Sequence, residues 1–147
     1  MNVSHFGGQI SGPGGFIDIS QGAKNIVFCG SFDAKGTKVA VDDGKLVILS
    51  HGRVAKLVET VAGITFSGSE AVKRGQRVRY VTERAVFALT PHGVELIEYA
   101  PGVDLKADVL ERMGFAPIVR NPVAMDPSLF VPMQPADVGQ VEAPVTK

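Results

Sequence analysis

Short apolar runs separated by turn-forming residues make up most of this chain. Few of the runs are long enough for a helix that spans several turns, so the pattern favours strands. After its first residue, Asn25–Cys29 is continuously apolar, which predicts a strand buried on both faces. Further strands are predicted at Thr37–Val41, Lys45–Leu49, Lys56–Val61, Ile64–Phe66, Arg77–Thr82, Ala85–Leu89 and Val94–Tyr99.

Turn residues indicate how some of these strands are connected. The sequence Asp42-Asp43-Gly44 contains an Asp-Gly pair between two apolar stretches, which is typical of a hairpin. The sequence Thr90-Pro91-His92-Gly93 combines a proline that presets φ with a glycine suited to positive φ. A second hairpin is therefore predicted between the last two strands.

Only two segments have the pattern of a helix. Ser67–Gly75 begins with residues that can cap a helix and ends with a glycine that can follow one. Asp104–Met113 has apolar residues every four positions, at Leu105, Val109 and Met113, which predicts a packing helix that Gly114 ends. The chain is thus predicted to be α/β, with many strands in an open mixed sheet and few helices.

Composition indicates one globular domain without a strong field. The 147 residues are 45% hydrophobic and 20% charged, and 15 basic residues balance 15 acidic ones. This balance argues against nucleic acid or a membrane surface as a partner. We expect residues 1–131 to form the domain, and residues 132–147, which are proline-rich and poor in bulky apolar residues, to form a mobile tail.

Cysteine usage and the lack of a leader pattern suggest a cytoplasmic protein. The single cysteine, Cys29, cannot form an internal disulfide and fits a reducing compartment. Because it lies in an apolar run, we expect a buried, inert thiol. The sequence has neither a signal-peptide pattern nor an apolar run long enough to span a bilayer.

The most distinctive local sequence is Gly12-Pro13-Gly14-Gly15-Phe16. Glycines permit positive φ and let backbone amides approach another atom closely. Such a turn can present amides to an anion or a developing oxyanion, and it can equally be a structural bend. Because we expect it to precede a strand, it does not match a dinucleotide-binding fingerprint.

Other catalytic patterns are missing from the sequence. The three histidines, His5, His51 and His92, lack partners at ligand spacing, so surface turns are expected rather than a metal site. There is no Gly-x-Ser-x-Gly nucleophile motif and no Gly-Lys-Ser/Thr phosphate loop. Glu83-Arg84 lies between two predicted strands and is expected to be structural.

Several segments in order resemble family I coenzyme A transferases. Gly12–Asp18 resembles the Gly-x-Gly-Gly turn of that family, and Ala34-Lys35-Gly36, twenty residues after Gly15, resembles its Lys-Gly landmark. Tyr80–Phe87 with Gly93–Leu96 looks like its paired C-terminal strands. The segments 100–104 and 125–130 are similar to the end of the single-chain acetate/propionate enzymes. The resemblance covers nearly the whole chain apart from the tail and identifies it as a C-terminal part.

The resemblance implies a reaction and a set of site residues. These enzymes move CoA from an acyl-CoA to a carboxylic acid through a glutamyl-CoA thioester. By resemblance, the Gly15 amide stabilises the oxyanion, the turn from Ser11 through Gly12, Gly14 and Gly15 lines the thiol end of CoA, and Lys35 meets the CoA moiety. CoA and short-chain acyl-CoA are then substrates, and neither a covalently bound cofactor nor a metal is expected.

The chain departs from the family pattern at the nucleophile. The family's glutamate lies upstream of the glycine turn in a Glu-Asn/Ser-Gly segment, whereas every glutamate here, from Glu59 to Glu142, lies downstream. We therefore expect a fragment that is inactive alone and that pairs with the missing N-terminal portion, a complementing chain or a second copy through the uncovered edge of Asn25–Cys29. The alternatives are a non-catalytic CoA- or nucleotide-binding module and the assembly half of a split enzyme.

Overall fold

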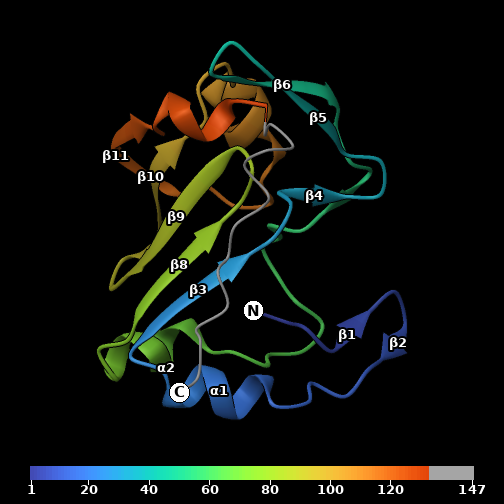
Figure 1. The fold of residues 1–147 in the computed structure, drawn as a ribbon. Helices are drawn as coiled ribbons and strands as arrows, with labels where there is room; N and C mark the ends of the chain where they lie inside the picture. Colours follow the sequence, from blue (N-terminus) through green and yellow to red (C-terminus); the bar gives the residue numbers. More distant parts are fainter. Residues whose placement is uncertain (133–147) are drawn as a thin grey trace, which may run out of the picture.

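A mixed five-stranded sheet forms the centre of the computed structural model, which describes residues 1–132 (Figure 1). The strand order is β11-β10-β9-β8-β3. The central strands β8, β9 and β10 are antiparallel neighbours, and each outer strand, β3 and β11, runs parallel to the strand beside it. The predicted strand-rich α/β fold with a mixed sheet is confirmed. Beyond Pro132, the predicted tail lies outside the described residues.

The strands of this sheet fall close to the predicted positions. Their bounds are β3 Asn25–Cys29, β8 Arg77–Val81, β9 Ala85–Thr90, β10 Gly93–Tyr99 and β11 Ile118–Ala124. Only β11 lacked a sequence signal, because Pro122 interrupts its apolar pattern and proline is tolerated in a strand only at an edge or a bulge. Beside β11, the register of β10 shifts between Leu96 and Glu98.

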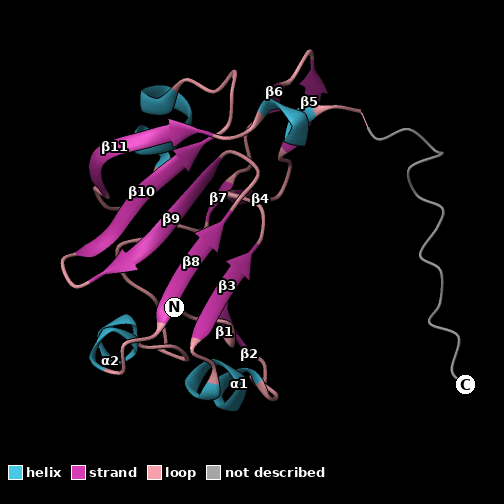
Figure 2. Ribbon diagram, turned by 60° about the vertical axis from the view of Figure 1, so that its left-hand side comes forward, coloured by secondary structure: helices cyan, strands magenta, loops and turns pink. Residues whose placement is uncertain are grey.

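The prediction that Asn25–Cys29 is buried on both faces is wrong. In β3, Ile26 and Phe28 point toward the core, whereas Asn25, Val27 and Cys29 are exposed. The strand lies at the edge of the sheet with β8 on one side and no neighbour on the other among the described residues (Figure 2). Cys29 is accordingly exposed rather than a buried thiol.

Three small two-stranded sheets surround the central one. They are β1 His5–Phe6 with β2 Gln9–Ile10, β4 Asp33–Ala34 with β7 Val54–Ala55, and β5 Lys38–Asp42 with β6 Lys45–Ser50. The predicted Asp-Gly hairpin is confirmed, since Asp43 and Gly44 both take positive φ, 45° and 72°.

Two short α-helices lie below the amino-terminal ends of β3 and β8 (Figures 1 and 2). The predicted helix near Ser67 is confirmed as α2, Gly68–Lys73, with the Ser67 hydroxyl accepting from the Glu70 amide. The other helix, α1 at Phe16–Gly22, has no capping side chain and was not predicted. The glycine turn therefore leads into α1, whereas the sequence pattern predicted that it leads directly into the strand β3.

The predicted α-helix over Asp104–Met113 forms with a different period. A π-helical turn covers Leu105–Val109, and a 3-10 turn covers Leu110–Arg112. Asp104 caps the segment as predicted, accepting from the Lys106 and Ala107 amides. Its apolar face is also as predicted, since Leu105, Val109, Leu110 and Met113 all pack into one core cluster. Packing all four side chains inward widens the turn beyond the α-helical period.

The strands predicted at Lys56–Val61 and Ile64–Phe66 are absent from the described structure. The segment is irregular because separate segments use its backbone groups. The Leu57 carbonyl accepts from the Gly114 amide, while the Thr65 and Phe66 amides both donate to the Met1 carbonyl. Tertiary hydrogen bonds have therefore replaced a local ladder.

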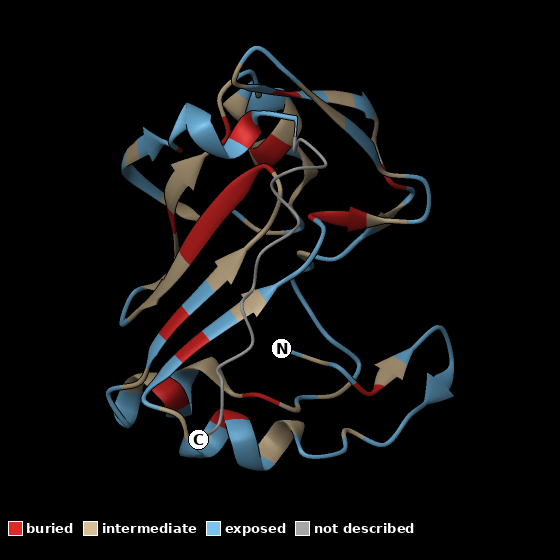
Figure 3. Ribbon diagram, in the orientation of Figure 1, coloured by how far each residue is buried: buried red, intermediate tan, exposed pale blue. Residues whose placement is uncertain are grey.

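The core consists of three adjoining apolar clusters around the central strands (Figure 3). The first joins Phe32, Phe87 and Leu96 to the π-helical turn. A second joins the β5–β6 hairpin to the 3-10 turn at Pro127–Phe130, and the third joins α1 and α2 to β3 and β8. Figure 3 shows β9 mostly buried, whereas the β1–β2 hairpin is largely exposed.

Close backbone contact at Gly52 provides a test of this packing. A Cβ at Gly52 would clash with the Ala34 carbonyl oxygen and lie 2.6 Å from Thr37 Oγ1 and 2.7 Å from the Ala34 nitrogen. We expect Gly52→Ala to lower the free energy of unfolding by about 3 kcal/mol, because backbone atoms must shift. Chemical denaturation measures this loss. The matched change Gly22→Ala, where nothing lies within 4 Å, should leave stability nearly unchanged, and equal effects of the two substitutions would contradict the packing.

Candidate functional site

The glycine turn is an exposed loop that leads into α1. Gly14 takes positive φ at 55°, and Gly15 is the N-terminal cap of the helix with ordinary φ and ψ of −77° and 2°. Ser11, Gly12, Gly14 and Gly15 are all exposed. The turn is tied to its neighbours by hydrogen bonds from the Ser11 amide to the Ser4 carbonyl (2.7 Å) and from Phe16 to Pro13 (3.1 Å).

Not every amide of this turn has an internal acceptor. The Phe16 amide donates to Pro13, whereas the Gly15 amide donates to no backbone carbonyl within residues 1–132. Gly15 is therefore an exposed residue whose N–H group has no backbone acceptor in the described structure. Chemically, the turn can offer one backbone donor to an oxygen outside the chain.

Lys35 lies on a separate element at the other end of β3. It follows β4 directly, is exposed and takes positive φ at 60°. Its carbonyl accepts from the Arg53 amide (3.2 Å), so Lys35 and Arg53 extend the β4–β7 pairing. Both views place β4 beyond the carboxyl end of β3 and α1 beside its amino end (Figures 1 and 2). The turn and Lys35 therefore do not form one compact site.

A buried charged cluster lies beneath the β4–β7 pair, centred on the guanidinium of Arg84. This side chain is completely buried, and its Nε is 2.8 Å from Glu83 Oε1 and its Nη2 3.5 Å from Asp33 Oδ1. The guanidinium also lies 4.7 Å from the centre of the Phe32 ring. The expected structural role of Glu83-Arg84 is consistent with this position.

The cluster also ties together elements that are distant in sequence. Arg84 Nη1 donates to the Asp108 carbonyl and approaches His51 Nδ1, both at 3.2 Å. Because a guanidinium has no acceptor, His51 must accept at Nδ1, which leaves its Nε2–H facing Asp108 Oδ1 at 3.4 Å. The sequence pattern predicted a surface turn at His51. In the structure, His51 is instead half-buried in the hydrogen-bonded cluster around Arg84.

The environment of Asp33 favours its charged form. Burial alone would raise the pKa of this carboxyl group. Hydrogen bonds from Thr37 and the Gly52 amide, together with the charges of Arg84 and Arg112, outweigh burial and lower the pKa below its ordinary value of 3.8. Asp33 Oδ2, Arg84 Nη2 and Arg112 Nε lack hydrogen-bond partners in the described structure, so the Asp33–Arg84 and Asp33–Arg112 pairs are charge contacts at 3.5 and 3.6 Å beside the cluster's hydrogen bonds.

Sequence patterns contain little indication of this cluster. Its members come from four segments, and no spacing rule connects Asp33, His51, Arg84 and Asp108. The only local signal was a charged pair at a tight turn between two apolar strands. Within residues 1–132, no three His, Cys, Asp or Glu side chains gather in a way that could hold a metal ion, and no helix is long and apolar enough to cross a membrane.

Comparison with known proteins gives consistent results. No family model matches the chain. It is 49% identical over 132 residues to the acetate CoA-transferase YdiF of Escherichia coli K12 and 46% identical over 136 residues to the caffeate CoA-transferase of Acetobacterium woodii. These matches cover 89% and 88% of this chain.

A solved structure shares the fold as well as the sequence. The apoenzyme of the acyl-CoA transferase YdiF from E. coli O157:H7 superposes with a TM-score of 0.86 at 50% identity, over 88% of this chain. The chain matches the C-terminal part of a CoA-transferase. It spans about a quarter of the length of the curated relatives, 25% and 26%. The structure of a thioester complex of YdiF with CoA also superposes on this chain, with a TM-score of 0.86 at 50% identity.

Removing the charge of Asp33 tests the buried cluster. We expect Asp33→Asn to lower the free energy of unfolding at neutral pH by about 2 kcal/mol, because the buried Arg84 loses one of its two carboxylate partners and keeps only Glu83. Since the folded pKa of Asp33 is lowered, its contribution is present above the unfolded value of 3.8 and is lost as pH falls through the folded value.

Denaturation across acidic pH measures this effect. The stability difference between the two proteins should be largest at neutral pH and shrink below about pH 4 as Asp33 is protonated. Glu70→Gln, which breaks the exposed Glu70–Lys73 pair at 2.8 Å, is the control and should cost little at any pH. A gap that stays constant down to low pH would contradict the charge-based account.

Proposed function

We propose that residues 1–132 act as part of an acyl-CoA:carboxylate CoA-transferase, in which the glycine turn contacts the reacting thioester. The observation that carries this proposal is the 49% identity to a CoA-transferase over nearly the whole chain. It is supported by the exposed amide of Gly15, which has no backbone acceptor in the described structure.

The proposed reaction needs a carboxylate nucleophile and a donor to an oxyanion. A glutamate attacks the acyl-CoA carbonyl, the C–S bond breaks, and an acyl-glutamyl anhydride and CoA thiolate form. The thiolate then attacks the glutamyl carbonyl, which releases the carboxylate of the acyl group and leaves a glutamyl-CoA thioester. An acceptor carboxylate repeats the sequence in reverse. Each attack passes through a tetrahedral oxyanion that fixed N–H groups stabilise.

The Gly15 amide suits the role of this donor. Its position is fixed by the cap of α1 and by the Phe16–Pro13 hydrogen bond, so it needs little reorganisation during the reaction. A Cβ built on Gly15 would have one neighbour within 4 Å in the described structure, Ile19 Cδ1 at 3.5 Å. Ser11, Gly12 and Gly14 add a stretch of backbone without bulk, which lets the thiol end of CoA approach closely.

In this proposal the nucleophile lies outside residues 1–147. The first glutamate of the chain is Glu59, and none precedes the glycine turn. The chain alone should therefore transfer no CoA, and activity requires a segment that carries the glutamate. The acyl specificity depends on that segment as well.

The exposed edge of β3 is the proposed surface for that segment. Beside this edge, the exposed face that β3 shares with its neighbour β8 has a hollow of about 280 Å³, lined by Asn25, Ile26, Val27, Arg77 and Arg79. Val27 is 57% exposed there, which is unfavourable for an apolar side chain on a strand with unpaired backbone groups. A strand from the missing segment, or from a second copy of this chain, would pair at this edge.

A reconstitution experiment tests the oxyanion role. The chain is mixed with a polypeptide that carries the remaining part of a CoA-transferase, and exchange of labelled acetate into acetyl-CoA is measured. Neither part alone should exchange label, and the mixture should. Gly15→Val in the mixture should lower turnover by about a hundredfold, because the side chain displaces the donor or obstructs the thioester.

The control in this assay is Gly22→Val, at the other end of α1, where a Cβ meets nothing within 4 Å. It should leave turnover close to that of the unchanged mixture. Exchange by the isolated chain, or equal activity of the two valine variants, would contradict the proposed function.

Self-association tests the edge strand independently of catalysis. We expect the molar mass of the isolated chain, measured by light scattering, to rise with concentration, and Val27→Lys to keep it monomeric because a charge at the edge opposes pairing. The control is Leu129→Lys. Leu129 is similarly exposed, at 69%, but it lies in the 3-10 turn at Pro127–Phe130, far from β3 in the sequence. A monomer at all concentrations, or an equal effect of Leu129→Lys, would argue against pairing at this edge.

A further inference from the structure

Basic side chains gather where β4 pairs with β7. We call residues 31–38 and 50–56 the cationic ribbon. They contain four cations, Lys35, Lys38, Arg53 and Lys56, all exposed, against one carboxylate, Asp33, which is buried and already paired with Arg84. In a chain with no net charge, this concentration is local and not a consequence of composition.

Two of these cations occupy opposite positions across the ribbon. The register pairs Asp33 with Ala55 and Ala34 with Val54, and the next pair, Lys35 and Arg53, is joined by the 3.2 Å hydrogen bond between their backbones. Like charges at directly opposed positions repel each other. Neither side chain has a carboxylate within ion-pair distance in the described part of the chain. The repulsion is therefore left for an external anion to relieve.

The backbone that carries these cations is held in place by its surroundings. Lys35 takes positive φ at 60°, which is unfavourable for a residue with a Cβ and is retained only where the surroundings impose it. Gly52 packs directly on Ala34, and the buried Asp33 anchors the ribbon to Arg84 below and to Arg112, whose Nη2 lies 3.6 Å from Asp33 Oδ2. Binding one anion to both side chains then requires no ordering of the backbone between them.

We propose that the cationic ribbon binds the phosphate groups of CoA, and that Arg53 is a phosphate-binding residue together with Lys35. This inference rests on the proposed function. A guanidinium can bind a phosphate through two parallel hydrogen bonds, and the lysine ammonium adds a second positive charge. No role for Arg53 follows from the sequence motifs, because it lies outside both glycine-containing landmarks.

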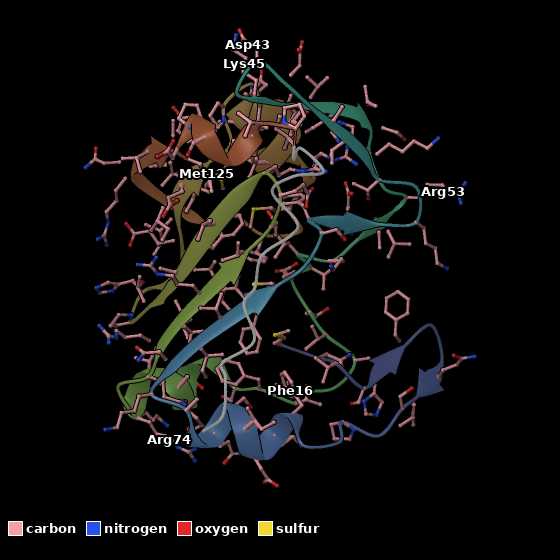
Figure 4. The ribbon with its side chains drawn as sticks, in the orientation of Figure 1. Phe16, Asp43, Lys45, Arg53, Arg74 and Met125 are labelled. Atoms are coloured by element: carbon pink, nitrogen blue, oxygen red, sulfur yellow. The ribbon has the colours of Figure 1, made fainter. Side chains whose placement is uncertain are left out.

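The position of the ribbon favours CoA over a compact anion. The glycine turn and the ribbon lie at opposite ends of β3 (Figures 1 and 2), a strand of five residues that spans roughly 16 Å. CoA is an extended molecule whose pantetheine arm separates the thiol from the phosphates. A thiol at Gly15 therefore requires a phosphate site some distance away, and Figure 4 shows Arg53 at the edge of the molecule above the level of Phe16, which follows the turn.

Backbone amide shifts measured by NMR test each end of CoA separately. Titration with CoA should shift the amides of Lys35, Gly36 and Arg53, inorganic pyrophosphate should shift the same amides, and pantetheine should not. Amides of Gly14, Gly15 and Phe16 should respond to CoA and pantetheine but not to pyrophosphate. Unmoved Lys35 and Arg53 amides in millimolar CoA would overturn the phosphate site.

Matched variants test the role of Arg53 itself. Arg53→Gln should weaken CoA affinity by about tenfold and reduce its dependence on salt, because one charged contact is lost. Arg74→Gln removes an exposed arginine near α2, which Figure 4 places at the opposite end of the molecule, and should leave affinity unchanged. Equal affinities of the Arg53 variant and the unchanged chain would overturn the assignment.

The two proposals fail in different ways. If the glycine-turn amides respond to CoA while the ribbon amides do not, the ribbon assignment is wrong and the proposed function stands. If pyrophosphate and CoA shift only the ribbon and pantetheine shifts nothing, the ribbon binds phosphate and the oxyanion role of the turn is wrong. A response to pyrophosphate without any response to CoA contradicts the phosphate site as a CoA site.

Discussion

Burial of the Arg84 guanidinium determines how several distant segments pack against the central sheet. A buried charge without compensation costs several kcal/mol, so its partners must be brought to it. They come from β4 through Asp33, from the segment after β6 through His51, and from the π-helical turn through the Asp108 carbonyl. Each of these segments is thereby fixed against the β8–β9 turn, although none is adjacent to it in sequence.

This constraint also positions the proposed ligand contacts. The same Asp33 that pairs with Arg84 lies in β4, two residues before Lys35, so the cationic ribbon is tied to the central sheet through a buried ion pair. The glycine turn is fixed differently, by α1 and the apolar cluster below β3 and β8. The two ends of the proposed CoA site are therefore held by separate parts of the core, with β3 between them.

Sequence patterns predicted the elements whose signals are local. The Asp-Gly hairpin, the Ser67 cap of α2 and the central strands depend on neighbouring residues and were found correctly. The exposure of Cys29 depends on how neighbouring segments cover the strand, and an apolar run carries no such information. The open edge of β3 was expected, because the chain resembles only a part of the family. The π-helical turn depends on packing Leu110 together with Val109. Of the candidate site, the turn and Lys35 were recognised through family resemblance, whereas the contacts of His51, Asp33 and Arg84 arise only from the tertiary fold.

In the proposed site, one CoA molecule has its thiol at the glycine turn and its phosphates at the cationic ribbon. The most direct measurement attaches a nitroxide spin label to the CoA thiol and records the broadening of backbone amide signals. We expect strong broadening at Gly14, Gly15 and Phe16, with the Lys35 and Arg53 signals remaining sharp. Broadening centred on Lys35 and Arg53, or spread evenly over both regions, would contradict it.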